Sequence, residues 1–246
     1  MERKNMKSTI TAKPIYYLDE FDNPKFGKLV PVTEKNRDFI EGCIRIDSNY
    51  KNTLTNFVKD MVANYNYTTI LAALKEINKI NSTRLSGATM ERIAKGTLKE
   101  WPDINSLVSA LDGSVSGAKS LFEGIVKSAR YDVVSFASKV IFYLSDELNK
   151  LGRPCNAHKQ YSKYDSKVAA CLAAYIDVYD ILPSGKRYYK TWFTDKHHKK
   201  FANLWDFYAH YNDCLGALLR KVQIEHSYIH ALTRAELDHV IWYTQK

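Results

Sequence analysis

The residues best suited to chemistry are a lysine and an aspartate separated by 26 positions. Lys139 lies in an otherwise apolar run that also contains Phe136 and Ile141, and Asp165 stands where the next expected helix begins. Burial in a partly desolvated cleft favours the free amine of a lysine, which can attack carbon. An ionised aspartate nearby can stabilise positive charge that develops on a substrate. A lysine that extends to the surface and an aspartate that caps a helix fit the same pattern, so both interpretations stay open.

Two parts of the chain, about fifty residues apart, resemble one enzyme family, and the downstream part consists of two short segments. Residues 135–140 read Ser-Phe-Ala-Ser-Lys-Val, and residues 164–169, downstream of them, read Tyr-Asp-Ser-Lys-Val-Ala. Upstream, residues 81–92 read Asn-Ser-Thr-Arg-Leu-Ser-Gly-Ala-Thr-Met-Glu-Arg. These segments resemble the catalytic half and the Asn-rich turn, with its arginine and following helix, of the helix-hairpin-helix DNA glycosylases. The similarity is to the branch of the 8-oxoguanine DNA glycosylases and covers roughly residues 70–175.

The resemblance implies an enzyme that excises a damaged or modified base from double-stranded DNA after flipping the nucleotide out of the helix. Lys139 would attack the sugar and form a Schiff base, through which a lyase reaction can also nick the strand. Asp165 would stabilise the positive charge on the sugar. Tyr143 and Trp242 would line the pocket for the extruded base.

The same resemblance implies a set of DNA contacts. Asn81 and Ser82 would belong to the turn that enters the duplex, with Asn81 in the gap left by the flipped base. Arg84 would hold the base that has lost its partner. The family's hairpin usually reads Leu-Pro-Gly-Val-Gly, whereas residues 129–134 here read Ala-Arg-Tyr-Asp-Val-Val. Because no glycine lets the backbone approach a phosphate closely, Lys127 or Arg130 would take over that contact.

The composition agrees with a polyanionic partner. The 246 residues include 36 Lys and Arg against 27 Asp and Glu, which gives a formal net charge of +9. Cations can contact phosphates, and the 17 Tyr, 10 Phe and 4 Trp include rings that could stack on bases. A lysine-rich proteome would produce the same excess, so charge alone does not identify a nucleic acid.

Few glycines and prolines favour an all-α fold. So does a helical spacing of apolar residues at positions 54, 57, 58, 61 and 62 and at positions 70, 71, 74 and 77, which predicts two helices. We expect a glycosylase-like arrangement of two helical halves around a cleft, with a degenerate hairpin. Residues 1–45 are expected to be irregular, with an extended piece at 28–32, and residues 46–246 to form one compact helical domain. Helices are expected over 131–151, 194–223 and 234–243, and from near residue 165. The expected N-caps are Asp103 or Asn105, and Thr233.

Two other functions fit the sequence. One is a catalytically inert DNA-binding module of the same fold, which the degenerate hairpin favours. The other is a HEPN-type ribonuclease that works without metal, since Arg220 and His226 match the loose Arg-x(4–6)-His pattern of that class.

We expect no cofactor and no metal. The four cysteines are scattered and form no CxxC pair, and His226 and His230, at i and i+4, are more typical of a solvated helix face. No apolar run approaches the roughly 20 residues of a membrane span. We therefore expect a soluble, nucleoid-associated monomer in the cytoplasm, serving DNA repair or defence against modified foreign DNA.

Overall fold

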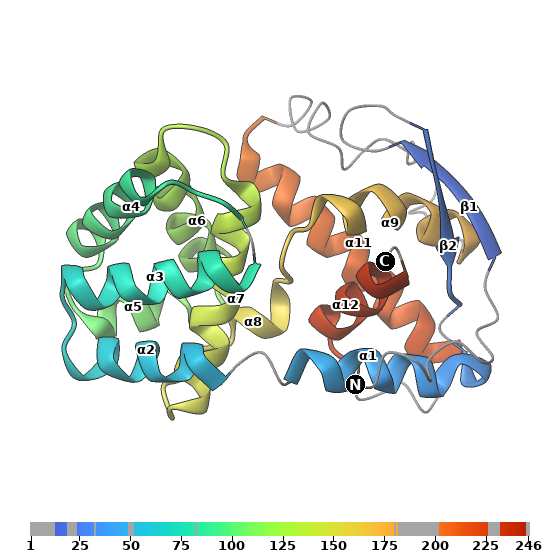
Figure 1. Ribbon diagram of the computed structural model, residues 1–246, viewed down its shortest axis with the longest axis horizontal. Coiled ribbons are helices and arrows are strands. Elements are labelled where there is room, and N and C mark those ends of the chain that lie inside the picture. Colours follow the sequence, from blue (N-terminus) through green and yellow to red (C-terminus); the bar gives the residue numbers. More distant parts are fainter. Residues whose placement is uncertain are drawn as a thin grey trace. The chain divides into compact units, whose positions relative to one another are not determined.

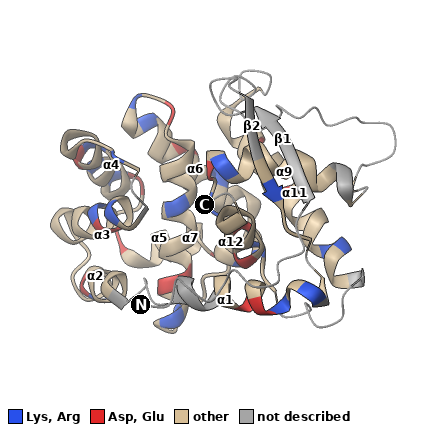
Figure 2. Cartoon of the chain, turned by 45° about the vertical axis from the view of Figure 1, so that its right-hand side comes forward, with Lys and Arg blue, Asp and Glu red and all other residues tan. Residues whose placement is uncertain are grey.

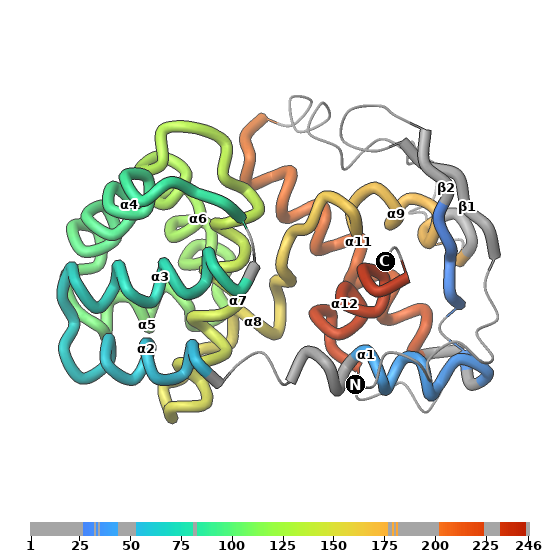
Figure 3. The backbone as a smooth tube through the Cα atoms, viewed as in Figure 1, coloured from blue at the N-terminus to red at the C-terminus, as the bar shows by residue number. Residues whose placement is uncertain are grey.

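The computed structural model describes residues 13–18, 24–31, 33–48, 52–81, 83–179, 181, 202–225 and 232–244. The chain divides into two compact units: unit 1 combines Met1–Asn49 with Asp165–Lys246, and unit 2 is Tyr50–Tyr164. In Figure 3, where colour follows residue number, unit 1 contains the described blue and red segments near the two ends of the chain, and unit 2 runs from cyan to yellow. The division differs from the expected one, in which residues 46–246 form a single compact domain.

The described residues of unit 2 form helices and the loops that join them (Figure 1). Most of these helices pack on the next one along the chain, except that α4 packs on α3 and α6 rather than on α5. The helix α7 packs against α2, α3, α6 and α8. The helices of unit 2 are α2 (Asn52–Ala63), α3 (Tyr67–Asn81), α4 (Gly87–Glu100), α5 (Ile104–Ala110), α6 (Val115–Ala129), α7 (Val134–Lys150) and α8 (Ala157–Gln160).

The apolar positions that predicted the first helices form the core of unit 2. Leu54, Val58 and Met61 of α2 are buried, as are Leu74 and Ile77 of α3. Polar side chains begin the later helices: the hydroxyl of Ser86 accepts the Thr89 N–H, and the Asp103 carboxylate forms a capping box with Ser106. The expected cap at Asp103 is therefore confirmed.

The helix α7 is buried along almost its whole length and begins later than its sequence predicted. It starts at Val134 rather than at Tyr131, because α6 ends at Ala129 and its C-cap Arg130, with a left-handed φ of 70°, begins the turn between the two helices. Phe136, Ala137 and Ile141 lie in the core. Burial on all sides of the helix explains why residues 136–144 are mostly apolar.

Unit 1 joins the two ends of the chain. Strands β1 (Lys13–Leu18) and β2 (Pro24–Leu29) pair antiparallel, with Lys13 opposite Leu29 and Leu18 opposite Pro24. The short η1 (Glu34–Asn36) leads into α1 (Arg37–Ser48), and the remaining helices are α9 (Ser166–Val178), α11 (Leu204–Glu225) and α12 (Arg234–Thr244).

The expectation of an irregular segment over residues 1–45 is wrong for the part that the structure describes. Residues 13–48 contain the strand pair and the helix α1, because distant segments cover them: α1 packs on α12, and both strands pack on α9. The Tyr175 hydroxyl of α9 accepts the Val30 N–H at 3.1 Å, and its burial raises the pKa of that hydroxyl. Val30 and Tyr175 are 145 positions apart, so local sequence did not reveal these contacts.

The C-terminal helices match their prediction at most ends. α12 has its expected cap, since the Thr233 hydroxyl accepts the Glu236 N–H at 3.2 Å and the Glu236 carboxylate accepts the Thr233 N–H at 2.7 Å. α11 begins at Leu204, whereas its expected start at residue 194 lies outside the described residues. The prediction of a mainly helical protein is confirmed. Among the described residues, no helix combines the length and apolar character needed to cross a bilayer.

Candidate functional site

Lys139 is buried on α7, with 6% of the residue exposed. Its amine donates to the Ser135 hydroxyl oxygen at 3.0 Å, and that hydroxyl donates to the backbone carbonyl of Tyr164 at 3.2 Å. The Ser138 hydroxyl oxygen accepts the Tyr164 N–H at 2.9 Å. One turn of α7 therefore holds both backbone groups of Tyr164, and the amine of Lys139 is part of the same hydrogen-bonded chain.

Asp165 is the residue that follows Tyr164, and it caps α9. Its carboxylate accepts the Lys167 N–H at 2.9 Å, and its carbonyl accepts the Ala169 N–H at 2.9 Å. This is the N-cap geometry that the sequence predicted. Asp165 is the first residue of the second segment of unit 1, whereas Lys139 belongs to unit 2. A shared cleft for the two side chains stays a prediction.

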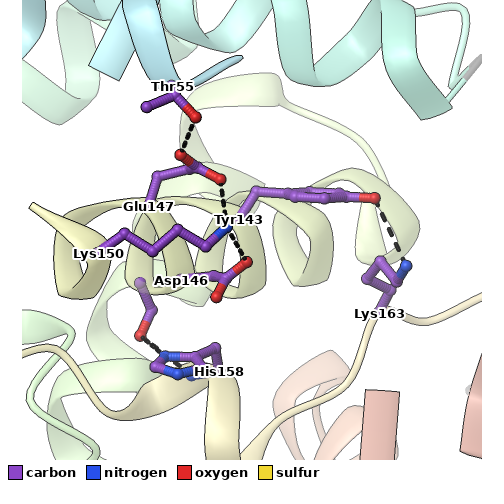
Figure 4. A network of polar contacts seen from close by, with 8 residues as sticks. Thr55, Tyr143, Asp146, Glu147, Lys150, His158 and Lys163 are labelled. Carbon is purple, nitrogen blue, oxygen red and sulfur yellow. Dashed lines mark hydrogen bonds and ion pairs between the residues drawn. The ribbon is translucent and has the colours of Figure 1, made fainter. Parts of the chain in front are cut away.

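Tyr143, one turn beyond Lys139, is buried with its ring against a second lysine. The Lys163 amine lies 5.4 Å from the Tyr143 ring centroid and 5.3 Å from that of Phe142, and it is 3.5 Å from the Tyr143 hydroxyl (Figure 4). Sequence reasoning did not single out Lys163, which is 6% exposed. The sequence feature that could have pointed to Lys163 is its position one residue before Tyr164. Its burial, however, depends on the packing of α7.

The far half of α7 carries a polar network that connects α2, α7 and α8 (Figure 4). Glu147 is fully buried; its carboxylate accepts from the Thr55 hydroxyl at 2.6 Å and from the Lys150 amine at 2.7 Å. Burial lowers the pKa of Lys150, but hydrogen bonds and charges from Glu147 and Asp146 outweigh this, so the pKa is raised. The Ser145 hydroxyl lies 2.9 Å from Nδ1 of His158. Because every group has a structural partner, we assign this network to stability.

The turn before α4 presents Arg84 in a strained conformation. Arg84 is exposed and has a φ of 57°, and Asn78 fixes the residues on either side of it. The Asn78 side-chain oxygen accepts from the Thr83 hydroxyl at 2.6 Å and from the Leu85 N–H at 3.1 Å. Asn81 is the last residue of α3; its side chain and Ser82 lie outside the described residues.

The turn between α6 and α7 stands where the resemblance places the hairpin. Lys127 and Arg130 are both exposed, and Arg130 adopts the left-handed conformation that glycine would otherwise supply. Val133 precedes α7 and gives it no side-chain cap. One cation and one carboxylate occur in this turn (Figure 2).

This turn contacts the start of α4. The Arg92 guanidinium donates to the Ala129 carbonyl at 3.2 Å and to the Thr89 hydroxyl at 2.9 Å, and the Tyr131 hydroxyl donates to the same Thr89 oxygen at 3.3 Å. The structure thus brings the segment that follows Arg84 and the segment around Arg130 to one end of unit 2.

The remaining candidates lie in unit 1. Trp242 on α12 is half-buried and stacks on His239 at 5.6 Å between ring centroids, so a base pocket shared with Tyr143 of unit 2 stays a prediction. Arg220 is exposed on α11, and its proposed ribonuclease partner His226 lies outside the described residues, as does His230.

Comparison with known proteins gives no functional assignment for this chain. No protein-family model, curated protein or solved structure matches the chain. Within the described ranges, no group of three or more His, Cys, Asp or Glu side chains is placed to hold a metal ion.

Proposed function

We propose that this protein is a DNA glycosylase that excises a damaged or modified base from duplex DNA, with Lys139 as its nucleophile. One observation carries the proposal: the buried Lys139 amine is hydrogen-bonded through Ser135 to the carbonyl of Tyr164, directly before the helix-capping Asp165. A buried amine that is linked to the backbone next to an aspartate fits attack on a sugar whose positive charge that aspartate stabilises.

The chemistry requires the neutral amine of Lys139. Its lone pair forms a bond to C1′ of the deoxyribose while the glycosidic bond breaks, and the base departs with the bonding electrons and takes up a proton. Opening of the sugar converts the adduct to an imine, from which loss of a proton at C2′ and cleavage of the C3′–O bond would nick the strand. Asp165 would stabilise the sugar as the glycosidic bond weakens.

The charge of unit 2 supports a DNA partner. Tyr50–Tyr164 contains 16 Lys and Arg against 10 Asp and Glu. Arg84 and Arg130 are exposed cations on the two turns that meet at Thr89, and Lys127 is an exposed cation in the last turn of α6. We propose that Lys127 and Arg130 contact phosphates and that Arg84, with the turn at Asn81 and Ser82, contacts the base opposite the lesion.

The first prediction is a covalent trap. An abasic duplex bypasses the unknown base specificity, since its free aldehyde condenses with an amine and releases water. Borohydride should reduce this imine to a stable protein–DNA adduct, and peptide mapping should place the adduct on Lys139. Lys139→Gln should abolish trapping, whereas Lys163→Gln, which removes the other buried lysine among the described residues, should leave it. Denaturing gels and mass spectrometry measure both outcomes.

A second arm of this experiment concerns Asp165. Asp165→Asn keeps a capping side chain but removes the charge, so release of a modified base should fall by about 10²–10³. Base release is measured on a panel of duplexes with different modified bases. An adduct on another lysine would overturn the role of Lys139. If no abasic duplex is trapped and no base of the panel is released, the inert DNA-binding module becomes the better account.

A further inference from the structure

Tyr131 is a large aromatic residue with 47% of its surface exposed, at the tip of the turn between α6 and α7. Its hydroxyl donates to Thr89, which fixes the ring at one edge. Among the described residues, the other large hydrophobic residue with such exposure is Val115, at the start of α6. An exposed aromatic ring whose hydroxyl is hydrogen-bonded is more typical of a residue that contacts a binding partner than of one that packs in a core.

The backbone beside Tyr131 is in an unfavourable conformation. Arg84 and Arg130 are the non-glycine residues with positive φ in the part of the chain that the structure describes. Side chains disfavour this region, and residues held in it are often found at functional sites. Both are exposed arginines, and no ion pair between described residues involves either of them. Two cations are therefore displayed at a conformational cost.

The hydrogen bonds around Thr89 fix these features relative to one another. Thr89 lies in the first turn of α4, shortly after Arg84, and its hydroxyl oxygen accepts from both Tyr131 and Arg92. Arg92 also holds the Ala129 carbonyl, directly before Arg130. The aromatic ring is thus attached to the framework that carries both strained arginines.

We propose that the Tyr131 ring stacks on an unpaired nucleobase of the DNA that Arg84 and Arg130 hold through its backbone or base edges. The identity of the partner as DNA rests on the proposed function, whereas the stacking role of Tyr131 goes beyond it. Positive charge next to an exposed ring complements a nucleotide, which offers a phosphate and a flat base together. An abasic position supplies such a base, because the nucleotide opposite it lacks a partner.

The test uses the full chain with Lys139→Gln, so that no chemistry intervenes. The probe is a duplex with a tetrahydrofuran abasic analogue opposite 2-aminopurine, and fluorescence anisotropy measures the dissociation constant. Tyr131→Ala should weaken binding by about ten-fold or more, the range of one stacked base. Tyr131→Phe keeps the ring but loses the hydrogen bond to Thr89, so its affinity should lie between those of the parent and Tyr131→Ala. Val115→Ala, the matched exposed apolar residue, should bind within about two-fold of the parent.

A second readout separates stacking from general loss of affinity. Stacking on the ring at position 131 should quench the 2-aminopurine fluorescence when the parent or Tyr131→Phe saturates the duplex. With saturating Tyr131→Ala, this quenching should be absent. Equal binding and equal quenching by parent and Tyr131→Ala would overturn the inference and leave the glycosylase proposal to the trapping experiment. Stacking without any trapping by the wild type would support Tyr131 as a DNA contact and count against the glycosylase. If the parent binds no DNA at all, the inference is wrong.

Discussion

At the scale of single residues, Glu147 shows how unit 2 tolerates a buried charge. The carboxylate is fully buried, yet one oxygen accepts from Thr55 of α2 and the other from Lys150 of its own helix. A buried carboxylate is costly unless its oxygens have partners. Glu147 therefore connects α2 to α7, and the same helix holds Lys139 two turns earlier.

A substitution at Thr55 tests the hydrogen bond to Glu147. Thr55→Val keeps the shape of the side chain but leaves a Glu147 oxygen without its hydroxyl, so the free energy of unfolding should fall by about 1–3 kcal/mol. The matched control is Thr68→Val, an exposed threonine of α3, which should change it by no more than about 0.5 kcal/mol. Urea denaturation followed by circular dichroism measures both. Equal effects of the two substitutions would show that the Thr55 hydrogen bond contributes nothing specific.

At the scale of elements, the close contact between α4 and α6 supports the two turns that carry the exposed arginines. A Cβ atom built on Gly96 of α4 would lie 2.0 Å from the Ser128 hydroxyl oxygen and 2.9 Å from the Ser128 Cβ of α6. Glycine at this position lets the helices approach. The approach in turn places the Ala129 carbonyl within reach of Arg92.

The close approach of Gly96 to Ser128 can be tested by adding a methyl group at position 96. Gly96→Ala should lower the free energy of unfolding by about 1–3 kcal/mol, because the helices must separate to admit the methyl group. Gly87→Ala, on the same helix with open space around it, should leave stability unchanged or raise it by up to about 1 kcal/mol. Adding Ser128→Ala to Gly96→Ala should recover part of the loss. A neutral Gly96→Ala in thermal and urea melts would contradict the packing.

At the scale of the whole molecule, the two units differ in how the chain builds them. Unit 2 is one continuous segment, Tyr50–Tyr164, whereas unit 1 needs both ends of the chain. A continuous segment of this size with its own buried core is in the range of independently folding domains. Unit 1 depends on contacts such as that between Val30 and Tyr175.

We therefore predict that residues 50–164 fold as a separate chain, with helical circular dichroism and a cooperative thermal transition. Phe136→Ala in this fragment should lower the transition temperature sharply, because Phe136 is 1% exposed and its loss leaves a cavity. Since Arg84, Arg130 and Tyr131 all lie in unit 2, the fragment should also bind abasic duplex, more weakly as salt rises. A fragment that melts without cooperativity, or that Phe136→Ala does not affect, would contradict this prediction.

The sequence by itself determined the local features of this protein. The spacing of Leu54, Val58 and Met61 placed a buried helical face, and Asp103, Asp165 and Thr233 marked helix starts that the structure shows capped. These features depend on residues within one turn of each other, so a short stretch of sequence contains all the information they need.

Only the tertiary structure decided which side chains are buried and which turns meet. Lys139 fitted a surface lysine as well as a buried one, and its burial arises from the helices around α7. The burial of Lys163, the pairing of strands 13–18 and 24–29 and the left-handed Arg130 escaped prediction. Each is set by segments far away in the sequence or by a backbone conformation that its residue type disfavours. For a polar side chain such as Lys139, burial is a property of the folded chain that no local pattern specifies.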